Sequence, residues 1–400
     1  MQSAICCTVC HSENLQTVLD FGQQPPANRF VNFSVASSSD ETYRLALGLC
    51  NDCSIIQLTE RMPVEAIRPR FDWLLYNEPE GHLDDVVTNL MALPGIGQDS
   101  LLLGTTYKDE STLARLERLG VSSTACIQEQ DLGDLTYSFG LETIQNALQD
   151  DETLNTLKKK YGEVDMMIVR HIIEHASSAK NLLSNMSKML KSGGYMVLEM
   201  PDSEHIFQAG NHGFIWEEHI SYFTENAIFK IANSAGAEVV WIKRYSYPYE
   251  DSLIAVLRFD ENQVTLTASK DEIQKVTILL EGFAKGLETQ RSYWRKTLEE
   301  YKAKDMPVAV FGAGHLAVKF INFLQLEDLV DCVIDDHPKK NKLVMPGSHL
   351  PIVPSSELHE RGIKICISTL SPESEVKVKN KLPDYFSSGG IFIPASIAQS

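Results

Sequence analysis

Residues 308–317 read Val-Ala-Val-Phe-Gly-Ala-Gly-His-Leu-Ala. Four apolar residues followed by G-x-G-x-x-A are typical of a buried strand that turns tightly into a helix. The next predicted strand ends at Asp335, about twenty residues further on, which is the usual spacing of an acid that binds a ribose. Amide groups at the start of such a helix attract a diphosphate. The stretch predicts a Rossmann-like α/β domain over residues 306–400.

This glycine turn is open to more than one interpretation. Taken alone, the residues favour NAD as the ligand. A tight strand–helix turn that binds nothing is the alternative, because glycines also permit close packing.

A second α/β region is predicted upstream, over residues 73–260. Apolar runs separated by amphipathic segments indicate a parallel sheet with helices on both faces. Residues 238–242 and 254–259 are two alternating runs that predict an antiparallel pair. The expected parallel strands are 100–103, 124–127, 166–169 and 195–200, with a helical pattern through Leu113, Leu116 and Leu119 and a helix over 179–190.

Residues 271–304 have apolar positions at three-, four- and seven-residue steps, which predicts one long helix. We expect this helix to pack between domains, and a dimerisation seam is the alternative. The expected division is a small N-terminal domain (1–72), a central α/β domain (73–260), a connecting helix (261–305) and a C-terminal domain (306–400).

Two C-x-x-C knuckles, Cys7/Cys10 and Cys50/Cys53, occur near the N-terminus. Two such knuckles can supply the four thiolates of a closed, structural zinc site. Disulfides or a redox C-x-x-C are the alternatives, and Cys6 could replace Cys7.

The chain has 400 residues and a net charge of −18, which argues against nucleic acid or an anionic membrane as a general partner. A local basic pocket for one phosphorylated small molecule remains compatible with this charge. We expect a cytoplasmic protein, because neither a signal peptide nor an apolar run of about 18 residues is visible.

The knuckles bracket Phe-Gly-Gln-Gln-Pro-Pro-Ala-Asn-Arg-Phe at residues 21–30. This combination resembles the zinc-binding N-terminal domain of the sugar C-methyltransferase family, whose members act on nucleotide-linked deoxysugars. The likeness continues in the same order through the later domains, at residues 170–175, 191–194, 217–223, 333–340 and 346–352.

The resemblance implies a class I methyltransferase-type central domain that binds S-adenosylmethionine and methylates a carbon next to a keto group. The nucleotide sugar is expected in the cleft between the central and C-terminal domains. His219 matches a catalytic base, Glu218 its neighbour in a Glu-His pair, and His175 a histidine near the transferred methyl group. Expected cofactor-binding residues are Gly104, Thr105, Gln128, Glu129 and Arg170, and expected substrate-binding residues are Gly312, Gly314, His315, Asp335 and His349.

Two features of the sequence leave alternatives open. Leu102 stands where the family has an acid, and Tyr107 and Lys108 stand where small residues are usual, while Trp216 replaces a tyrosine. The alternatives are therefore proton chemistry on a nucleotide sugar without a methyl donor, such as epimerisation, or a sugar-binding regulator of surface-polysaccharide assembly.

His171 and His175 are four residues apart, as in a metal pair on one helix face. Because no third ligand is evident nearby in the sequence, we expect a structural or substrate-binding role for them instead.

Overall fold

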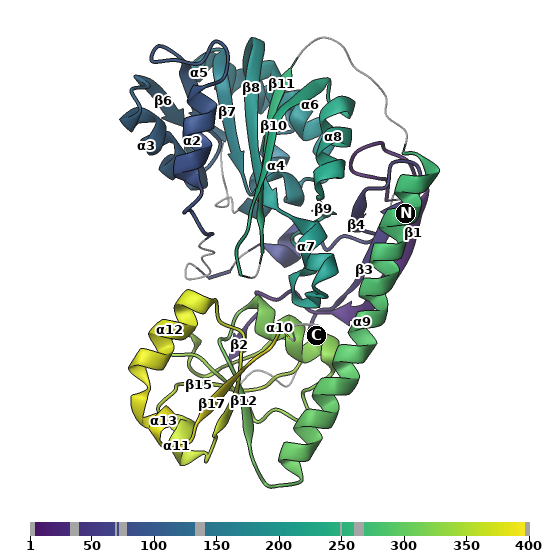
Figure 1. Ribbon diagram of the computed structural model, residues 1–400, viewed down its shortest axis with the longest axis vertical. Coiled ribbons are helices and arrows are strands. Elements are labelled where there is room, and N and C mark those ends of the chain that lie inside the picture. Colours follow the sequence, from purple (N-terminus) through teal and green to yellow (C-terminus); the bar gives the residue numbers. More distant parts are fainter. Residues whose placement is uncertain are drawn as a thin grey trace.

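The computed structural model describes most of the chain, namely residues 5–32, 40–68, 70–71, 78–132, 141–248, 250–259 and 268–396. Figure 1 shows a central α/β domain, a C-terminal α/β domain below it, and helix α9 (Lys270–Lys302) running along the side of the molecule. No helix of the described ranges has both the length and the apolar character needed to cross a membrane. The expected boundaries at 72/73 and 260/261 lie outside the described residues.

The central sheet has the strand order β10-β11-β8-β7-β5-β6. Strand β11 runs antiparallel to both of its neighbours, while β8, β7, β5 and β6 are parallel to one another. This is the arrangement expected for a class I methyltransferase-type domain, and it includes the predicted antiparallel pair. The strands are β5 (Leu101–Gly104), β6 (Ser123–Cys126), β7 (Val164–Arg170), β8 (Leu190–Pro201), β10 (Ala237–Tyr245) and β11 (Ser252–Phe259).

Alternate residues of the central strands enter two separate cores. Met166 and Ile168 of β7 pack on one face of the sheet, and Met167 and Val169 pack on the other. Both faces are therefore covered, as in α/β folds whose parallel strands are apolar throughout. The flanking helices are α2 (Leu83–Met91), α3 (Glu110–Arg118), α4 (Leu141–Ala147), α5 (Asp151–Tyr161), α6 (Ala179–Met186), α7 (Ser203–Gln208) and α8 (Glu225–Ser234).

The predicted helix 179–190 was too long at its C-terminal end. Helix α6 ends at Met186, a 3-10 turn follows over Ser187–Met189, and β8 begins at Leu190. Leu190 pairs with Val164 of β7, and the ladder resumes at Tyr195 after a register shift. Gly193 lies within this irregular segment at φ +75°, a conformation that glycine adopts without strain.

The N-terminal domain shares strands with both other domains. Its sheet has the order β1-β3-β4-β9, and β9 (Ser221–Tyr222) comes from the central part of the chain. The short strand β2 (Val31–Asn32) pairs with β14 (Leu343–Val344) of the C-terminal domain. The remaining elements are β1 (Leu15–Gln24), β3 (Tyr43–Cys50), β4 (Ile56–Leu58) and α1 (Val64–Ile67).

The C-terminal domain is a parallel sheet of order β15-β13-β12-β16-β17. The predicted strand–glycine–helix unit is confirmed as β12 (Val308–Phe311) followed by α10 (His315–Leu324). The other elements are β13 (Cys332–Ile334), β15 (Ile352–Val353), α11 (Glu357–Glu360), β16 (Ile365–Ser368), α12 (Pro372–Lys381), α13 (Pro383–Ser387) and β17 (Ile391–Pro394).

Helix α9 packs between domains, as predicted. It contacts β1, α7 and α10, which belong to three different parts of the fold. Its buried stripe comprises Leu280, Phe283, Leu287, Trp294 and Leu298.

Candidate functional site

The four knuckle cysteines lie together, with their sulfur atoms within 4.8 Å of one another. Cys7 and Cys53 have sulfurs 3.4 Å apart, and Cys10 and Cys50 have sulfurs 3.6 Å apart. These distances exceed the S–S bond of a disulfide by far and approach the roughly 3.8 Å edge of a tetrahedral zinc–thiolate site. The group therefore fits a structural zinc ion, and Cys6 is not part of it.

The loop over residues 215–220, which leads into β9, carries His219. Its ring centroid lies 5.0 Å from that of His175 and 4.8 Å from that of Trp216. Burial, followed by the nearby His175 and His315, holds the pKa of His219 well below its usual range. The residue as a whole is half-buried, and its ring belongs to a buried group with Glu174 and His175. His219 is thus an uncharged imidazole, which is the state required of a general base.

The partners of His219 are themselves fixed. His175 Nδ1 lies 2.7 Å from the main-chain oxygen of Glu218, a contact that determines the orientation of its ring. The Glu218 side chain is buried, and its Oε1 accepts from Asn28 Nδ2 at 3.4 Å. The structure therefore brings the three expected catalytic residues together, with Glu218 turned toward the N-terminal domain.

The interpretation of His171 and His175 needs correction. They do not share a helix face, because His171 has a φ of 55° in a turn before the 3-10 segment Ile173–His175. His175 instead forms a group with Glu174 and His219, whose ligand atoms lie within 4.8 Å of one another. The expectation that no third ligand lies nearby was wrong, since a carboxylate and two imidazoles are a set that transition metals accept.

The expected donor site lies at the carboxyl ends of β5 and β7, where the strand order reverses. There Asp109 is fully buried and accepts hydrogen bonds from Thr105 N, Thr105 Oγ1 and Thr106 N. Burial raises the pKa of Asp109 to about 6. Gly104 is needed for this tight turn, because a Cβ there would lie 2.8 Å from Asp109 Cβ.

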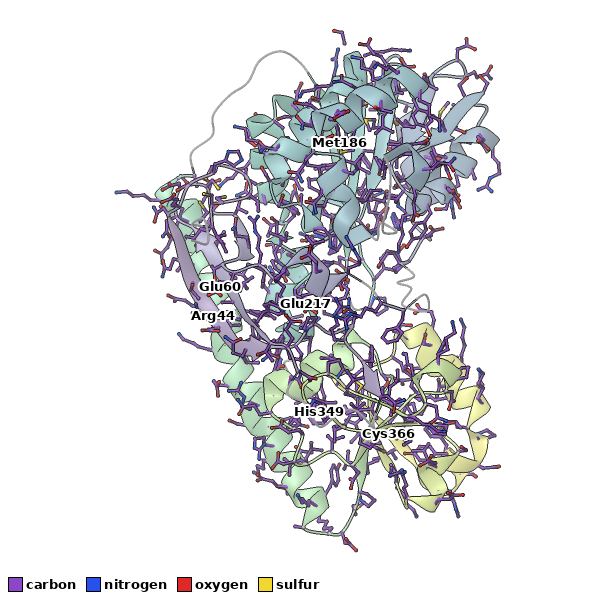
Figure 2. The ribbon with its side chains drawn as sticks, turned by 180° about the vertical axis from the view of Figure 1, so that it is seen from behind. Arg44, Glu60, Met186, Glu217, His349 and Cys366 are labelled. Atoms are coloured by element: carbon purple, nitrogen blue, oxygen red, sulfur yellow. The ribbon has the colours of Figure 1, made fainter. Side chains whose placement is uncertain are left out.

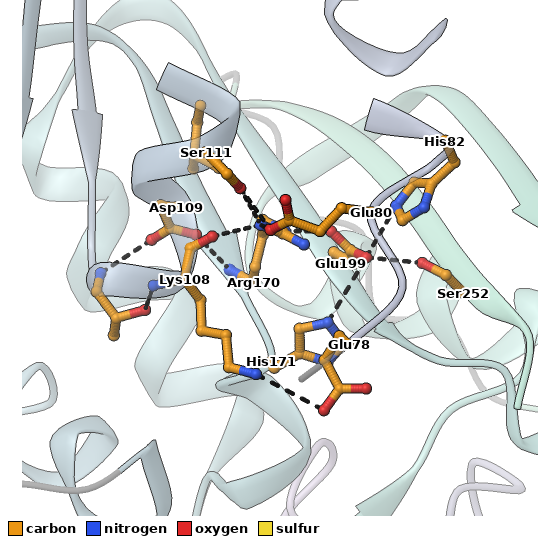
Figure 3. A network of polar contacts seen from close by, with 12 residues as sticks. Glu78, Glu80, His82, Lys108, Asp109, Ser111, Arg170, His171, Glu199 and Ser252 are labelled. Atoms are coloured by element: carbon orange, nitrogen blue, oxygen red, sulfur yellow. Dashed lines mark hydrogen bonds and ion pairs between the residues drawn. The ribbon is translucent and has the colours of Figure 1, made fainter. Parts of the chain in front are cut away.

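Charged side chains occupy the space beside this turn (Figure 3). Arg170 Nε donates to Glu199 Oε2, and both side chains are 2% exposed. Arg170 Nη1 also donates to the main-chain oxygen of Lys108 and to Glu80 Oε1. The Lys108 ammonium lies 3.7 Å from Glu78. The side of the turn where a methionine moiety is expected is thus filled by ion pairs of the chain itself.

The adenosine side of the expected donor site is more open. Gln128 and Glu129 follow β6 and are exposed. The residues expected to bind the adenosine half of S-adenosylmethionine are therefore open to a ligand. The place expected for its methionine half is occupied by the ion pairs of Arg170 and Lys108. Glu80, Glu199 and His82 were missed by the sequence analysis, although Glu199 was visible as a lone acid within an apolar strand.

The C-terminal domain offers a pocket at its own topological switch point, between β12 and β16. The pocket is open to solvent, and residues 210–214 of the central domain and Gln290 of α9 complete its lining. Ser368 and Thr369 form one wall, α10 forms another, and Thr369 Oγ1 donates to the main-chain oxygens of Phe311 and Gly312. This is where ligands of open α/β sheets bind. Gly312, at φ +101°, and Gly314 begin the helix beside it.

The other expected substrate residues are placed differently. Asp335 Oδ2 accepts from Ala313 N and from Lys340 Nζ, so the carboxylate braces the glycine turn. His349 Nε2 lies 3.0 Å from Asp40 Oδ2, and neither residue lines the pocket. His315 stacks on Trp216 with ring centroids 4.0 Å apart, which joins α10 to the loop of His219.

The sheet order, the cysteine group and the glycine turn together define a zinc-binding, multidomain protein of the methyltransferase fold. Comparison with known families agrees with this class. A putative zinc-binding domain matches residues 7–67, a methyltransferase domain matches 113–241, and a C-methyltransferase C-terminal domain matches 260–395. The three matched domains are the ones, in the same order, that the resemblance to the sugar C-methyltransferase family predicted.

Individual relatives are distant. The C-methyltransferase NovU of Streptomyces niveus is 18% identical over 236 residues, which is 58% of this chain and 56% of that protein. The chain thus spans about half the length of this curated relative.

Among solved structures, the 1,6-didemethyltoxoflavin-N1-methyltransferase of Burkholderia thailandensis is 12% identical. It has a TM-score of 0.30 and covers 45% of this chain and 80% of its own. The magnesium protoporphyrin IX methyltransferase of Synechocystis PCC 6803 is 15% identical, with a TM-score of 0.29 and coverages of 44% and 78%.

Proposed function

We propose that this chain is an S-adenosylmethionine-dependent C-methyltransferase that acts in the cytoplasm on a nucleotide-linked keto-deoxysugar. One observation carries the proposal. His219 is uncharged, and it lies beside His175 and Trp216 where the central domain meets helix α10 of the C-terminal domain.

Methylation of a sugar carbon requires removal of a proton from that carbon. A hydrogen next to a keto group is acidic enough for an imidazole base, because the electron pair is delocalised onto the carbonyl oxygen. His219 accepts the proton, and the carbon becomes the nucleophile of an enolate. His175, fixed by its contact with the Glu218 main chain, borders the same space.

The nucleotide is proposed to bind at the C-terminal domain. The pocket beside Ser368 and Thr369 lies at the switch point, and the glycine turn offers main-chain N–H groups for a diphosphate. Helix α10 starts at this turn and carries His315, which stacks on Trp216 next to His219. A substrate bound along this path would present its sugar to the base.

S-adenosylmethionine, when bound, supplies an electrophilic methyl group. Gln128 and Glu129 are proposed for its ribose, and Gly104, Thr105 and Arg170 surround the place of its methionine moiety. Since Arg170 and Lys108 fill that place, we assign no contact of the chain to the methyl-bearing sulfur.

A second candidate function follows from the ion pairs that lie where the methionine moiety of the donor is expected. The same base can remove the proton and return it to the other face of the carbon, which epimerises the sugar and needs no methyl donor. The buried Arg170–Glu199 pair favours this candidate, because its charges lie beside the turn where the methionine moiety is expected.

Isothermal titration of zinc-loaded protein with S-adenosylmethionine and S-adenosylhomocysteine tests the proposal. Binding, together with a product heavier by one CH₂ in mass spectrometry, supports methyl transfer. Absence of binding refutes it, and an isomerised product of unchanged mass then supports epimerisation. If nucleotide binds but no reaction occurs with any donor, the chain is a nucleotide-sugar-binding protein.

A further inference from the structure

Glu217, next to Glu218 and His219, lies where the three parts of the fold meet (Figure 2) and contacts both neighbouring domains. Its Oε1 accepts a hydrogen bond of 2.5 Å from the main-chain N–H of Ala27 in the N-terminal domain. Its Oε2 lies 2.6 Å from Lys319 Nζ of α10 in the C-terminal domain. The side chains of Glu217 and Lys319 are 0% exposed. One buried carboxylate of the central domain therefore ties the loop of His219 to both neighbouring domains.

The N-terminal domain holds the same loop a second time, through its sheet. Strand β9 follows His219 directly and pairs with β4, with Ile56 opposite Tyr222. Leu58 N also donates to Ile220 O at 2.9 Å. Removing the N-terminal domain would thus leave the end of this loop without its strand partner.

Helix α10 holds the loop from the other side. His315 stacks on Trp216, and Lys319, one helical turn later, pairs with Glu217. Because α10 begins at the glycine turn, a ligand at that turn and the loop of His219 contact the same rigid helix.

The buried pair is unlike an ordinary stabilising contact. Two charges taken out of water lose hydration that their attraction seldom repays, and apolar pairs of similar volume are often equally stable. A buried, fully paired carboxylate does fix one geometry, since any shift of the loop leaves a charge unpaired.

We propose that Glu217 and Lys319 are positioning residues, which set the distance between His219 and the nucleotide-binding end of α10. The N-terminal domain helps to hold the loop of His219, because Ala27 donates to Glu217 and β4 pairs with β9. This inference rests on the proposed role of His219 as a base.

Three variants test the inference: Glu217→Gln, Lys319→Met and the double variant with both changes. The readouts are kcat and KM for solvent deuterium entering nucleotide-linked keto-deoxysugars, and the affinities for UDP, GDP and dTDP. We expect kcat to fall about 10- to 100-fold, as for a small misplacement of a catalytic group. Nucleotide affinity and KM should remain unchanged in Glu217→Gln, because Glu217 does not line the pocket, whereas Lys319 does, so only kcat and amide exchange are interpreted for its variants. Lys285→Met, at an exposed position of α9, serves as the control.

The double variant separates positioning from stability. Lys319→Met leaves the Glu217 carboxylate buried without its cation, so its Tm should fall. The double variant removes both charges and should regain Tm, while kcat stays low. A kcat that recovers together with Tm would overturn the proposal, as would an unchanged kcat or, in Glu217→Gln, an equal loss of nucleotide affinity.

Amide hydrogen exchange of the peptide 215–223 provides a readout that is independent of activity. We expect the amides of this peptide to exchange faster in all three variants than in the wild type, and to exchange at the wild-type rate in Lys285→Met. Should the wild type catalyse no substrate exchange, the proposed function fails, and amide exchange alone decides whether Glu217 fixes the loop. Unchanged amide exchange in the variants would overturn the inference.

Discussion

Replacing Glu199 with Gln removes the charge at the centre of the network in Figure 3 while keeping the volume of the side chain. The Glu199 carboxylate is 2% exposed and meets Arg170 Nε, Ser252 Oγ at 2.9 Å and His82 Nε2 at 2.9 Å. His171 Nε2 lies 3.6 Å away. The opposing charges hold the pKa of Glu199 well below its ordinary value although burial alone would raise it, so the carboxylate is ionised at neutral pH.

The expected loss of stability in Glu199→Gln follows from the contacts that its partners keep and lose. Glutamine can still accept one hydrogen bond, but Arg170 and a charged His171 lose a buried counter-charge. Breaking one partner of a buried pair costs about 3–5 kcal/mol. Arg170 keeps its contacts with Glu80 and the Lys108 main chain, so we expect the lower end, about 3 kcal/mol.

Urea unfolding of the central-domain transition measures this loss. The control is Glu163→Gln in the central domain, which breaks a pair with Lys158 in which the side chains are 52% and 41% exposed. Exposed pairs contribute about 0–1 kcal/mol. A loss for Glu199→Gln that does not exceed the control would refute the view that this network stabilises the domain.

Three further predictions concern the zinc site, the pH dependence and the glycine turn. Purified protein should contain about one zinc per chain, which elemental analysis measures. Cys50→Ser should lower the metal content and, in calorimetry, destabilise the N-terminal domain, because binding energy at a structural site is folding energy. Cys6→Ser should retain the metal. Burial lowers the pKa of His171, but the carboxylates of Glu174 and Glu199, each 3.6 Å from its ring nitrogens, outweigh burial and raise it to about 10 from 6.5. The stabilisation by charged His171 is therefore complete below pH 6.5 and lost as the pH rises toward about 10, and His171→Asn should flatten the decline of Tm over this range. Gly312→Ala should weaken nucleotide binding and lower Tm, because its φ is +101° and the new Cβ would lie 2.8 Å from Leu370; an unchanged Tm would contradict the tight turn.

Local patterns predicted much of the fold. The spacing within C-x-x-C and G-x-G-x-x-A is set by covalent geometry, so the cysteine group and the β12–α10 turn could be read from a few neighbouring residues. The alternation of strands and helices likewise indicated the parallel sheets.

Contacts between distant segments could not be predicted in this way. Strand β9 has two residues, too few to show periodicity, and it joins a sheet built mainly from residues 15–58. The spacing of His171 and His175 suggested one helix face, but the positive φ of His171 turns it toward Glu199. The pair Lys319–Glu217 joins residues 102 positions apart and has no local signal.

The network at the donor site is a partial success of the sequence analysis. Lys108 in place of a small residue predicted an altered turn, and the structure shows this lysine beside Glu78. The share of Arg170 and Glu199 in filling the site was not predicted, because their pairing depends on the register of β7 and β8.

The proposed function depends most on His219 as the base that removes a sugar proton. The direct measurement is mass-spectrometric detection of solvent deuterium entering a nucleotide-linked keto-deoxysugar, for wild type and His219→Gln, with nucleotide affinity measured in parallel. We predict exchange in the wild type, a loss of about 10²–10⁴-fold in the variant, and unchanged nucleotide affinity, since the nucleotide is proposed to bind at Gly312 and Gly314. Exchange at the wild-type rate in His219→Gln would contradict the account and remove His219 from the mechanism.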